Sequence, residues 1–220
     1  MAAYSGPKIV SDNIVAHLDA SNRKSYDGTG STWFDISKFA NHGNLINGPT
    51  YTNQLVKSIE FDSVDDKLSF PIACSKTRYS IDFWCYPTQL TDWNWAMGFD
   101  SFWNDFGLHS TAQGGVYVGT STSSRISPWR NNVYVLNTWQ NFTWTFDNGL
   151  GKFYKNGKLE TSATLQLSSR SQFTYFNSGG SGPNNNCTGR LASLKIYNDR
   201  ALSLAEIQQN FEATRTRYGV

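Results

Sequence analysis

The alternation of apolar and polar residues is clearest between residues 139 and 160. Within this stretch, three aromatic residues alternate with polar ones in the order Phe142-Thr143-Trp144-Thr145-Phe146-Asp147. A period of two is typical of a strand with one buried face. Asn148-Gly149 and Asn156-Gly157 interrupt the pattern, and such pairs favour type I′ turns, because both central residues need a positive φ. The stretch therefore predicts a meander of antiparallel strands whose aromatic side chains point into a core.

Shorter segments elsewhere show similar patterns and are expected to be strands. They are Ile14–Leu18, Tyr79–Tyr86, Gly115–Gly119, Thr164–Leu167, Phe173–Phe176 and Gly189–Tyr197. Ser58–Phe70 has apolar pairs on both sides of a polar turn at Asp62–Asp66, which predicts a tight hairpin. Aromatic residues occupy both faces of Tyr79–Tyr86, so we expect this strand to be covered on both sides.

Only the end of the chain has a helical pattern. Ser203 and Glu206 form a capping box, in which the serine accepts from the third amide and the glutamate reaches back. One apolar helical face follows, made of Leu204, Ile207 and Phe211. The sequence therefore predicts an all-β fold, a two-sheet antiparallel β-sandwich with one short C-terminal helix. Residues 1–12 are expected to form an N-terminal arm, and residues 13–220 a single domain.

The composition argues against several classes of function. Aromatic residues make up 15% of the chain and charged residues 16%, with a net charge of +2. No block of lysine and arginine tracks a phosphate backbone, so we expect no binding to nucleic acid. No apolar stretch reaches the ~18 residues of a membrane span. The N-terminus lacks the charged and apolar regions of a signal peptide, so we expect neither membrane insertion nor signal-directed secretion.

The cysteines show no pattern of a bonded or metal-binding framework. Cys74, Cys85 and Cys187 are an odd number, without CxxC spacing and without a companion cluster of histidines. The sequence therefore favours buried thiols that act as small hydrophobic side chains.

Several segments, in their order along the chain, resemble one family. They are His17–Ser37, Ile59–Phe70, Tyr79–Pro87, Asn137–Leu159 and Ala192–Gly219. Together they resemble the laminin-G-like, concanavalin A-like lectin and glucanase jelly rolls. The two ends resemble the versions that tailed bacteriophages encode, especially marine ones. The resemblance implies two curved antiparallel sheets; many members bind sugars, and many phage members are virion surface or fibre proteins.

Calcium is the cofactor that the resemblance raises. Cellular members often hold this ion partly through an acidic residue in the last strand, but here Ala192-Ser193 stands in that place. The remaining candidate ligands are Asp19, Asp62, Asp65 and Asp66, because hard cations bind carboxylate oxygens. The alternative is that these aspartates form turns by accepting backbone hydrogen bonds. The sequence therefore predicts no cofactor, with calcium as an open alternative.

The sequence shows no motif that would place catalytic residues next to one another. The related glucanases use carboxylates on one strand, in an E-x-D-x-x-E pattern that is absent here. The glutamates are dispersed at Glu60, Glu160, Glu206 and Glu212, and the histidines at His17, His42 and His109. Asp62 and Asp66 have a suitable spacing but lie across an expected turn. The sequence therefore predicts that the protein is not an enzyme.

Sugar binding requires fewer specially placed residues than catalysis does, and one segment of the chain contains suitable ones. The candidate glycan-binding or interface residues are Trp93, Trp95, Trp103, Trp129 and Arg130. Aromatic faces stack on pyranose rings, while a few placed polar groups bond the hydroxyls. The alternative is that these tryptophans pack in the sandwich or against a neighbouring subunit, since tryptophan and arginine are also common at interfaces.

The resemblance and the absence of catalytic residues together predict a non-enzymatic virion structural protein of a tailed bacteriophage. It is expected on the exterior, as a capsid decoration or fibre-associated protein with a lectin-like fold, with adhesion to surface glycans as a further role. Its expected partners are other capsid or tail proteins, further copies of itself when assembled, and cell-surface glycans. It would be made in the host cytoplasm and located in the virion. The alternative is a free carbohydrate-binding module, with an endoglycanase as a remote third.

Overall fold

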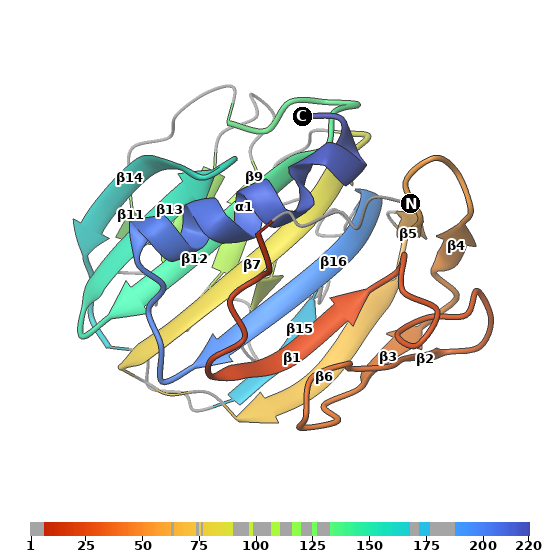
Figure 1. The fold of residues 1–220 in the computed structure, drawn as a ribbon, viewed down its shortest axis with the longest axis horizontal. Coiled ribbons are helices and arrows are strands. Elements are labelled where there is room, and N and C mark those ends of the chain that lie inside the picture. Colours follow the sequence, from red (N-terminus) through yellow and green to blue (C-terminus); the bar gives the residue numbers. More distant parts are fainter. Residues whose placement is uncertain are drawn as a thin grey trace.

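The computed structural model describes residues 7–62, 64–73, 75, 77–89, 97–98, 107–110, 116–119, 125–126, 133–167, 172–176 and 188–220. Over these residues the chain forms two antiparallel sheets packed face to face, with one helix near the C-terminus (Figure 1). The predicted all-β sandwich is confirmed. No helix among these residues is long and apolar enough to cross a bilayer.

One sheet carries the helix, and we call it the helix-covered sheet. Its strands, in spatial order, are β14 (Lys158–Thr164), β13 (Leu150–Lys155), β12 (Gln140–Asp147), β7 (Arg78–Pro87), β16 (Thr188–Asn198), β5 (Ser58–Asp62) and β4 (Thr50–Thr52), and β1 (Ile14–Asp19) also pairs with β16. The second sheet has the order β11 (Arg125–Ile126), β10 (Val116–Gly119), β9 (Gly107–Ser110), β8 (Met97–Gly98), β15 (Gln172–Phe176), β6 (Lys67–Ala73), β3 (Gly43–Ile46) and β2 (Thr32–Trp33). Strand β16 is central, because it pairs with β7, β5 and β1.

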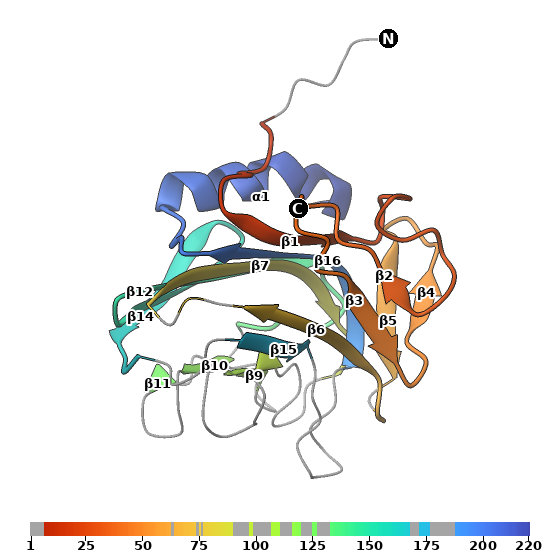
Figure 2. The same ribbon diagram turned by 90° about the horizontal axis from the view of Figure 1, so that it is seen from below.

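The main hydrophobic core lies between the two sheets, which Figure 2 shows edge-on beneath the helix. Its large buried side chains include Trp33, Phe61, Phe70, Phe83 and Trp144. Burying a Phe-sized side chain stabilises a fold by about 1.5–3 kcal/mol. The aromatic residues that alternate along β12 therefore do what the sequence pattern predicts, and hold the sheets together.

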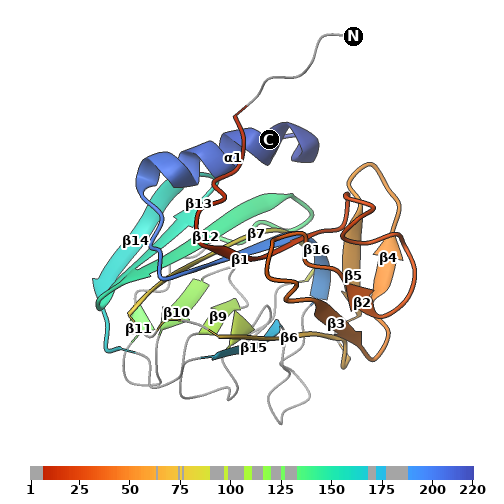
Figure 3. The same ribbon diagram turned by 60° about the horizontal axis from the view of Figure 1, so that its bottom comes forward.

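Helix α1 (Leu204–Tyr218) packs on the outer face of the helix-covered sheet (Figure 3). The capping box between Ser203 and Glu206 is present. Trp84 on β7 stacks against Tyr218 with ring centroids 3.8 Å apart, and its Nε1 donates to Thr214 Oγ1 at 3.0 Å. These contacts cover the outer face of β7, so the prediction of a strand buried on both sides is confirmed.

The prediction that β12 has only one buried face is wrong. Thr143 and Thr145 are buried as well as the aromatic residues between them. Thr143 Oγ1 donates to Asp82 Oδ2 at 2.9 Å, and Lys195 Nζ donates to Asp82 Oδ1 at 2.6 Å. A polar network with a buried ion pair therefore lies on the outer face of this sheet, on the side that carries α1, where the sequence pattern predicts exposed positions.

The hairpin expected over Ser58–Phe70 is also wrong. Strand β5 pairs with β16 and β4, whereas β6 pairs with β15 and β3 in the second sheet. The turn at Asp62–Asp66 is therefore a corner at which the chain crosses from one sheet to the other. The alternation of apolar residues predicts both strands correctly, but it carries no information about which neighbour each strand pairs with.

The strand expected at Thr164–Leu167 is misplaced too. Strand β14 ends at Thr164, and the amide of Leu165 donates to the carbonyl of Gly149 at 2.7 Å. The Leu165 side chain is buried in the main core. Apolar spacing therefore marks a buried position here rather than a strand.

The two Asn-Gly turns are confirmed. Asn148 and Gly149 have φ values of 46° and 94°, and Asn156 and Gly157 have values of 49° and 74°. Positive φ at both central residues is what a two-residue hairpin turn needs, because it matches the twist of the flanking strands. These turns set the register of β12, β13 and β14.

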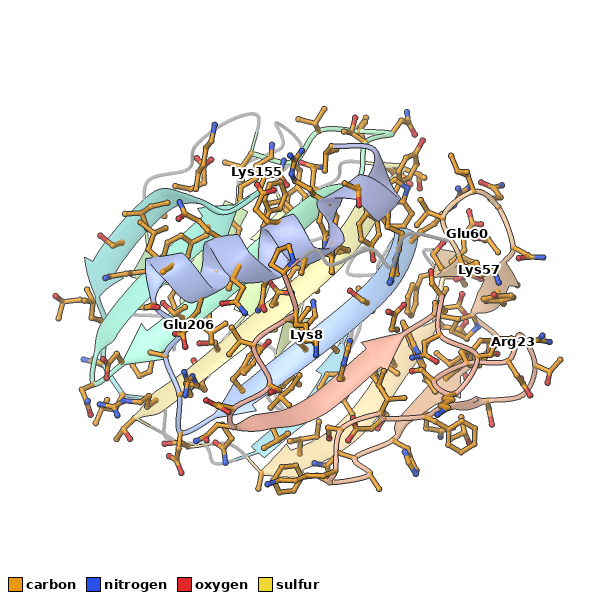
Figure 4. The ribbon with its side chains drawn as sticks, viewed as in Figure 1. Lys8, Arg23, Lys57, Glu60, Lys155 and Glu206 are labelled. Atoms are coloured by element: carbon orange, nitrogen blue, oxygen red, sulfur yellow. The ribbon has the colours of Figure 1, made fainter. Side chains whose placement is uncertain are left out.

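The described end of the predicted N-terminal arm, residues 7–12, is held to the helix. The amide of Val10 donates to Asn210 Oδ1 at 2.8 Å, and the Tyr197 hydroxyl donates to the Val10 carbonyl at 3.0 Å. Gln209 Nε2 donates to the carbonyl of Lys8, which Figure 4 shows beside α1. The Val10 side chain is buried, so this part of the arm belongs to the small core between α1 and the sheet.

Candidate functional site

The glycan-binding residues predicted from the sequence, Trp93, Trp95, Trp103, Trp129 and Arg130, lie outside the described residues. Two of the three cysteines, Cys74 and Cys187, lie outside them as well. Cys85 is described and fully buried, and burial raises the pKa of its thiol well above the ordinary value. This cysteine therefore behaves as the small hydrophobic side chain that the sequence predicts.

A different aromatic site lies among the described residues, and we call it the Trp139 groove. Its cavity has a volume of about 320 Å³ and is lined by Gln54, Leu55, Val56, Tyr86, Trp139, Arg190, Thr216, Arg217, Tyr218 and Gly219. These residues come from the loop between β4 and β5, the ends of β7 and β16, the segment before β12 and the C-terminal end of α1. Five parts of the chain that are distant in sequence therefore meet at one end of the helix-covered sheet.

Three aromatic rings form the apolar part of the groove. The Trp139 ring centroid lies 5.4 Å from that of Tyr86 and 5.3 Å from that of Tyr218, at an interplanar angle of 53° in both cases. Trp139 and Tyr86 are partly exposed, whereas Tyr218 is buried. Burial raises the pKa of the Tyr218 hydroxyl, and the Asp19 carboxylate raises it further. The groove therefore offers part-exposed Trp and Tyr rings on a packed aromatic base.

Arg190 supplies a positioned polar group beside these rings. The antiparallel register places Arg190 of β16 opposite Tyr86 of β7, and the guanidinium lies 5.3 Å from the Tyr86 ring centroid. Arg190 Nη1 donates to Gln54 Oε1 at 2.6 Å, and its Nε lies 3.6 Å from Glu60 Oε2. Figure 4 shows Glu60 near Lys57 at this end of the sheet. Pairing and ring contact hold the guanidinium in one orientation at the groove.

Arg217 is a second arginine in the lining of the groove. Its Nη1 donates to both oxygens of Asp19, at 3.0 and 2.8 Å. Burial alone would lower the pKa of Arg217, but the Asp19 carboxylate outweighs this and keeps that pKa above its ordinary value. The pair ties the end of α1 to the end of β1. Asp19, a candidate calcium ligand from the sequence, therefore accepts hydrogen bonds from an arginine in this structure.

The sequence of the chain matches the model of a known fold family. A family model described as the concanavalin A-like lectin/glucanases superfamily matches residues 62–208, which is more than half of the chain. The chain belongs to this superfamily. The family resemblance inferred from the sequence is thus confirmed, and the lectin-like jelly roll is the scaffold that brings the groove residues together. No curated protein matches the chain.

Solved structures of low sequence identity share the superfamily fold. The Trypanosoma rangeli sialidase in complex with sialic acid has 16% identity and a TM-score of 0.72, over 96% of this chain and 35% of the sialidase. The botulinum neurotoxin serotype D binding domain has 14% identity and a TM-score of 0.70, over 92% of this chain and 52% of the neurotoxin chain. Domain 4 of an extracellular arabinanase from Geobacillus stearothermophilus, in complex with arabinotriose, has 17% identity and a TM-score of 0.62. The match covers 91% of this chain and 98% of the arabinanase domain. The chain spans about a third of the sialidase.

The other candidate calcium ligands do come together. Carboxylate oxygens of Asp62, Asp65 and Asp66 all lie within 4.8 Å of one another at the corner between β5 and β6. Burial raises the pKa of Asp66, and its acidic neighbours add to this, while the hydrogen bond from the Asp62 amide lowers it. Oxygen donors of this kind suit a hard cation. The same side chains also form the turn, since Asp62 Oδ1 accepts from Val64 and Asp66 Oδ2 from Asp62. Calcium binding stays an open alternative.

Ala192-Ser193, where the resemblance implies an acidic residue in the last strand, is buried in this chain. The register of β16 against β7 shifts between Leu191 and Ser193, and both Ala192 and Ser193 are buried. Ala192 packs in a small core with Trp84 and Tyr218. In this chain the position therefore supports the helix rather than offering a carboxylate to a cation.

Sequence reasoning missed the groove residues because they are separated along the chain. Trp139 counts in the sequence only as the start of a strand, Tyr86 only as the end of one, and Arg190 as one cation among many. The pairing of β7 with both β12 and β16 is what brings them to one end of the sheet. The one signal available in the sequence is that Trp139 directly precedes the aromatic strand.

Proposed function

We propose that this protein is a non-enzymatic carbohydrate-binding protein and that the Trp139 groove holds the glycan. The observation that carries the proposal is the placement of part-exposed Trp139 and Tyr86 rings beside an oriented Arg190. Sites for small ligands combine aromatic walls with a few fixed polar groups, and this groove has that composition. The C–H face of a sugar ring packs on the rings, while Gln54 and Arg190 bond its hydroxyls.

The relatives give the proposal a context without deciding it. Two of the structures that share the fold were solved with sugars, namely sialic acid in a sialidase and arabinotriose in an arabinanase domain. Those sugars belong to those proteins. What supports a sugar ligand here is the chemistry of the groove, and the superfamily contains both lectins and glucanases.

Truncation of Trp139 tests the proposal. A glycan array identifies ligands, and calorimetry then compares the wild type with Trp139→Ala on the strongest of them. Loss of a central aromatic contact costs about 2 kcal/mol of binding free energy, so we expect roughly thirtyfold weaker binding. Phe34→Ala is the matched control, because Phe34 is an exposed aromatic residue outside the groove. A folded Trp139→Ala variant that binds as the wild type does would contradict the proposal.

The non-enzymatic part of the proposal needs its own measurement. Incubation with β-glucans and arabinans, followed by a reducing-end assay, is expected to show no release above a buffer control. Release that grows with protein concentration would instead make the protein a glycanase.

We propose further that the protein works on the exterior of a bacteriophage virion, bound to capsid or tail proteins. This proposal is supported by the resemblance of the two ends of the chain, Gly6–Ser37 and Tyr197–Asn210, to phage-encoded jelly rolls. Quantitative mass spectrometry of purified particles from the source tests it. Copies in the particles support the virion role, and their absence leaves the free carbohydrate-binding module.

A further inference from the structure

A second cavity lies beside strand β1, and we call it the His17 cavity. Its volume is about 830 Å³, larger than that of the Trp139 groove. Three segments line it, with residues from 9–17, 36–39 and 198–200. A volume of this size is within the range of sites that bind small molecules. The cavity contains none of the residues that line the Trp139 groove.

The two sites lie at opposite ends of one strand. Arg190, near the start of β16, lines the Trp139 groove, whereas Asn198, the last residue of β16, lines the His17 cavity. Eight residues of strand at about 3.3 Å each separate them by roughly 26 Å. A short ligand therefore cannot occupy both sites at once.

The walls of the cavity are held by hydrogen bonds within the protein. Asn13 Nδ2 donates to the Asn198 carbonyl at 3.2 Å, and the Asn198 amide donates to the Asn13 carbonyl at 3.0 Å. On the other side, Asp35 Oδ1 accepts from the amides of His17 and Ser37, both at 2.7 Å. These contacts fix the loop after β2 against β1, so the cavity is preformed.

Phe39 provides a half-exposed aromatic side chain at this cavity. Its side chain is 48% exposed, and Lys38 Nζ lies 5.1 Å from the ring centroid. Phe34 in the same loop is exposed to the same degree, at 47%, but does not line the cavity. Phe34 is therefore a matched control, which shows whether removal of any exposed aromatic side chain changes sugar binding.

The charges around the cavity balance. Asp12 and Asp199 are acidic, and Lys38 and Arg200 are basic. Arg200 Nη1 lies 3.8 Å from Asp12 Oδ2, and its Nη2 pairs with Glu206. With no excess of either sign among the lining residues, nothing in the cavity selects an anion or a cation. Neutral ligands rich in hydroxyl groups fit this rim best.

His17 adds a neutral hydrogen-bonding group to the lining. Burial lowers the pKa of its imidazole to about 4, and the nearby Lys195 ammonium lowers it further, while Asp19, Asp35 and Asp82 act in the opposite direction. The ring is therefore neutral at pH 7. A neutral imidazole has one donor and one acceptor nitrogen, which suits a hydroxyl group.

We propose that the His17 cavity is a second carbohydrate-binding site, which takes a short neutral oligosaccharide with Phe39 as the stacking face. The protein then binds glycans at both ends of β16. This proposal rests on the proposed function for the class of ligand, which is carbohydrate, and assigns that class to a separate site. None of the residues that line this site line the Trp139 groove.

Proton NMR of the histidine imidazoles tests the second site directly. Arabinotriose, cellotriose and chitotriose, at millimolar concentrations, are titrated into the wild type and into the Trp139→Ala, Phe39→Ala and Phe34→Ala variants. His17→Gln identifies the His17 resonances. We expect one of these sugars to shift the His17 resonances in the wild type, in Trp139→Ala and in Phe34→Ala. In Phe39→Ala the titration midpoint should rise by about tenfold, as expected for loss of an aromatic contact.

The two proposals fail in different ways. The proposal of a second site is wrong if the sugars bind but leave the His17 resonances unmoved. It is also wrong if the titration midpoint changes equally in Phe39→Ala and Phe34→Ala. In either case the proposal for the Trp139 groove still stands. If His17 responds while Trp139→Ala binds every array ligand as the wild type does, the groove is wrong and the second site stands. No change at His17 with any of the three sugars overturns the second site.

Discussion

His17 is neutral in the folded protein at pH values where an exposed histidine takes up a proton. Burial and the Lys195 ammonium lower its pKa to about 4 from an ordinary value of 6.5. The unfolded chain therefore binds the proton more readily than the folded one does. Stability from this group is complete above pH 6.5, and it is lost as the pH falls toward 4 and below.

Replacement of His17 by glutamine is expected to remove this pH dependence. The pKa difference between the folded and unfolded states corresponds to about 3 kcal/mol of unfolding free energy. Urea denaturation at pH 7 and near pH 4 measures the loss in each protein, and the wild type should lose more than His17→Gln. Equal losses would show that His17 takes up its proton in the folded state as easily as in the unfolded one.

Single residues of the candidate site were the hardest feature to predict from the sequence. Trp139 and Arg190 are unremarkable in the sequence, and they become a site only because β7 lies between β12 and β16. Asp19 is a candidate metal ligand from the sequence, and its partner Arg217 is about two hundred positions away, so spacing along the chain does not reveal this pair. Residue chemistry was visible in the sequence, while the partner of each residue was not.

At the scale of elements, helix α1 depends on its first turn and on Trp84. Ser203 Oγ accepts from the Glu206 amide, and Glu206 Oε2 accepts from the Ser203 amide at 2.8 Å. Both bonds satisfy amides that the helix leaves without an internal partner. Since α1 also covers Trp84, weakening this turn weakens the outer core of the sheet.

Ser203→Ala is therefore expected to destabilise the whole protein. Loss of an N-cap side chain costs about 1 kcal/mol. Chemical denaturation monitored by far-ultraviolet circular dichroism measures the change. Ser162→Ala is the matched control, because Ser162 is an exposed serine on β14. A change no larger than that of the control would mean that the capping box does not support the fold.

Local signals predicted elements well and pairings poorly. The Asn156-Gly157 turn and the capping box were predicted correctly, because each depends on a few adjacent residues with particular backbone angles. The sequence pattern predicts a hairpin at the Asp62–Asp66 corner, because a polar turn between two apolar segments looks the same whether the two strands share a sheet or not. The alternating pattern of β12 predicts exposed threonines, because it carries no sign that the outer face of this sheet is covered by α1, which lies far away in the sequence.

At the scale of the whole molecule, the fold was predictable because many weak signals agreed. Short strands, turn residues and one terminal helix all point to a two-sheet sandwich, and the structure confirms it. The end of β16 that meets the loop between β4 and β5 holds the Trp139 groove, and the other end holds the His17 cavity. A sandwich of this kind places variable loops at its two ends, where ligands reach them.

The claim that the Trp139 groove binds glycan has one most direct test. Two-dimensional proton–nitrogen NMR of the wild type is recorded with and without the strongest glycan from the array, and the Trp139 indole signal is assigned from the Trp139→Ala spectrum. We predict that this indole N–H shows one of the largest shifts, together with the amides of Gln54 and Arg190. A glycan that binds while the Trp139 indole does not move would contradict the account.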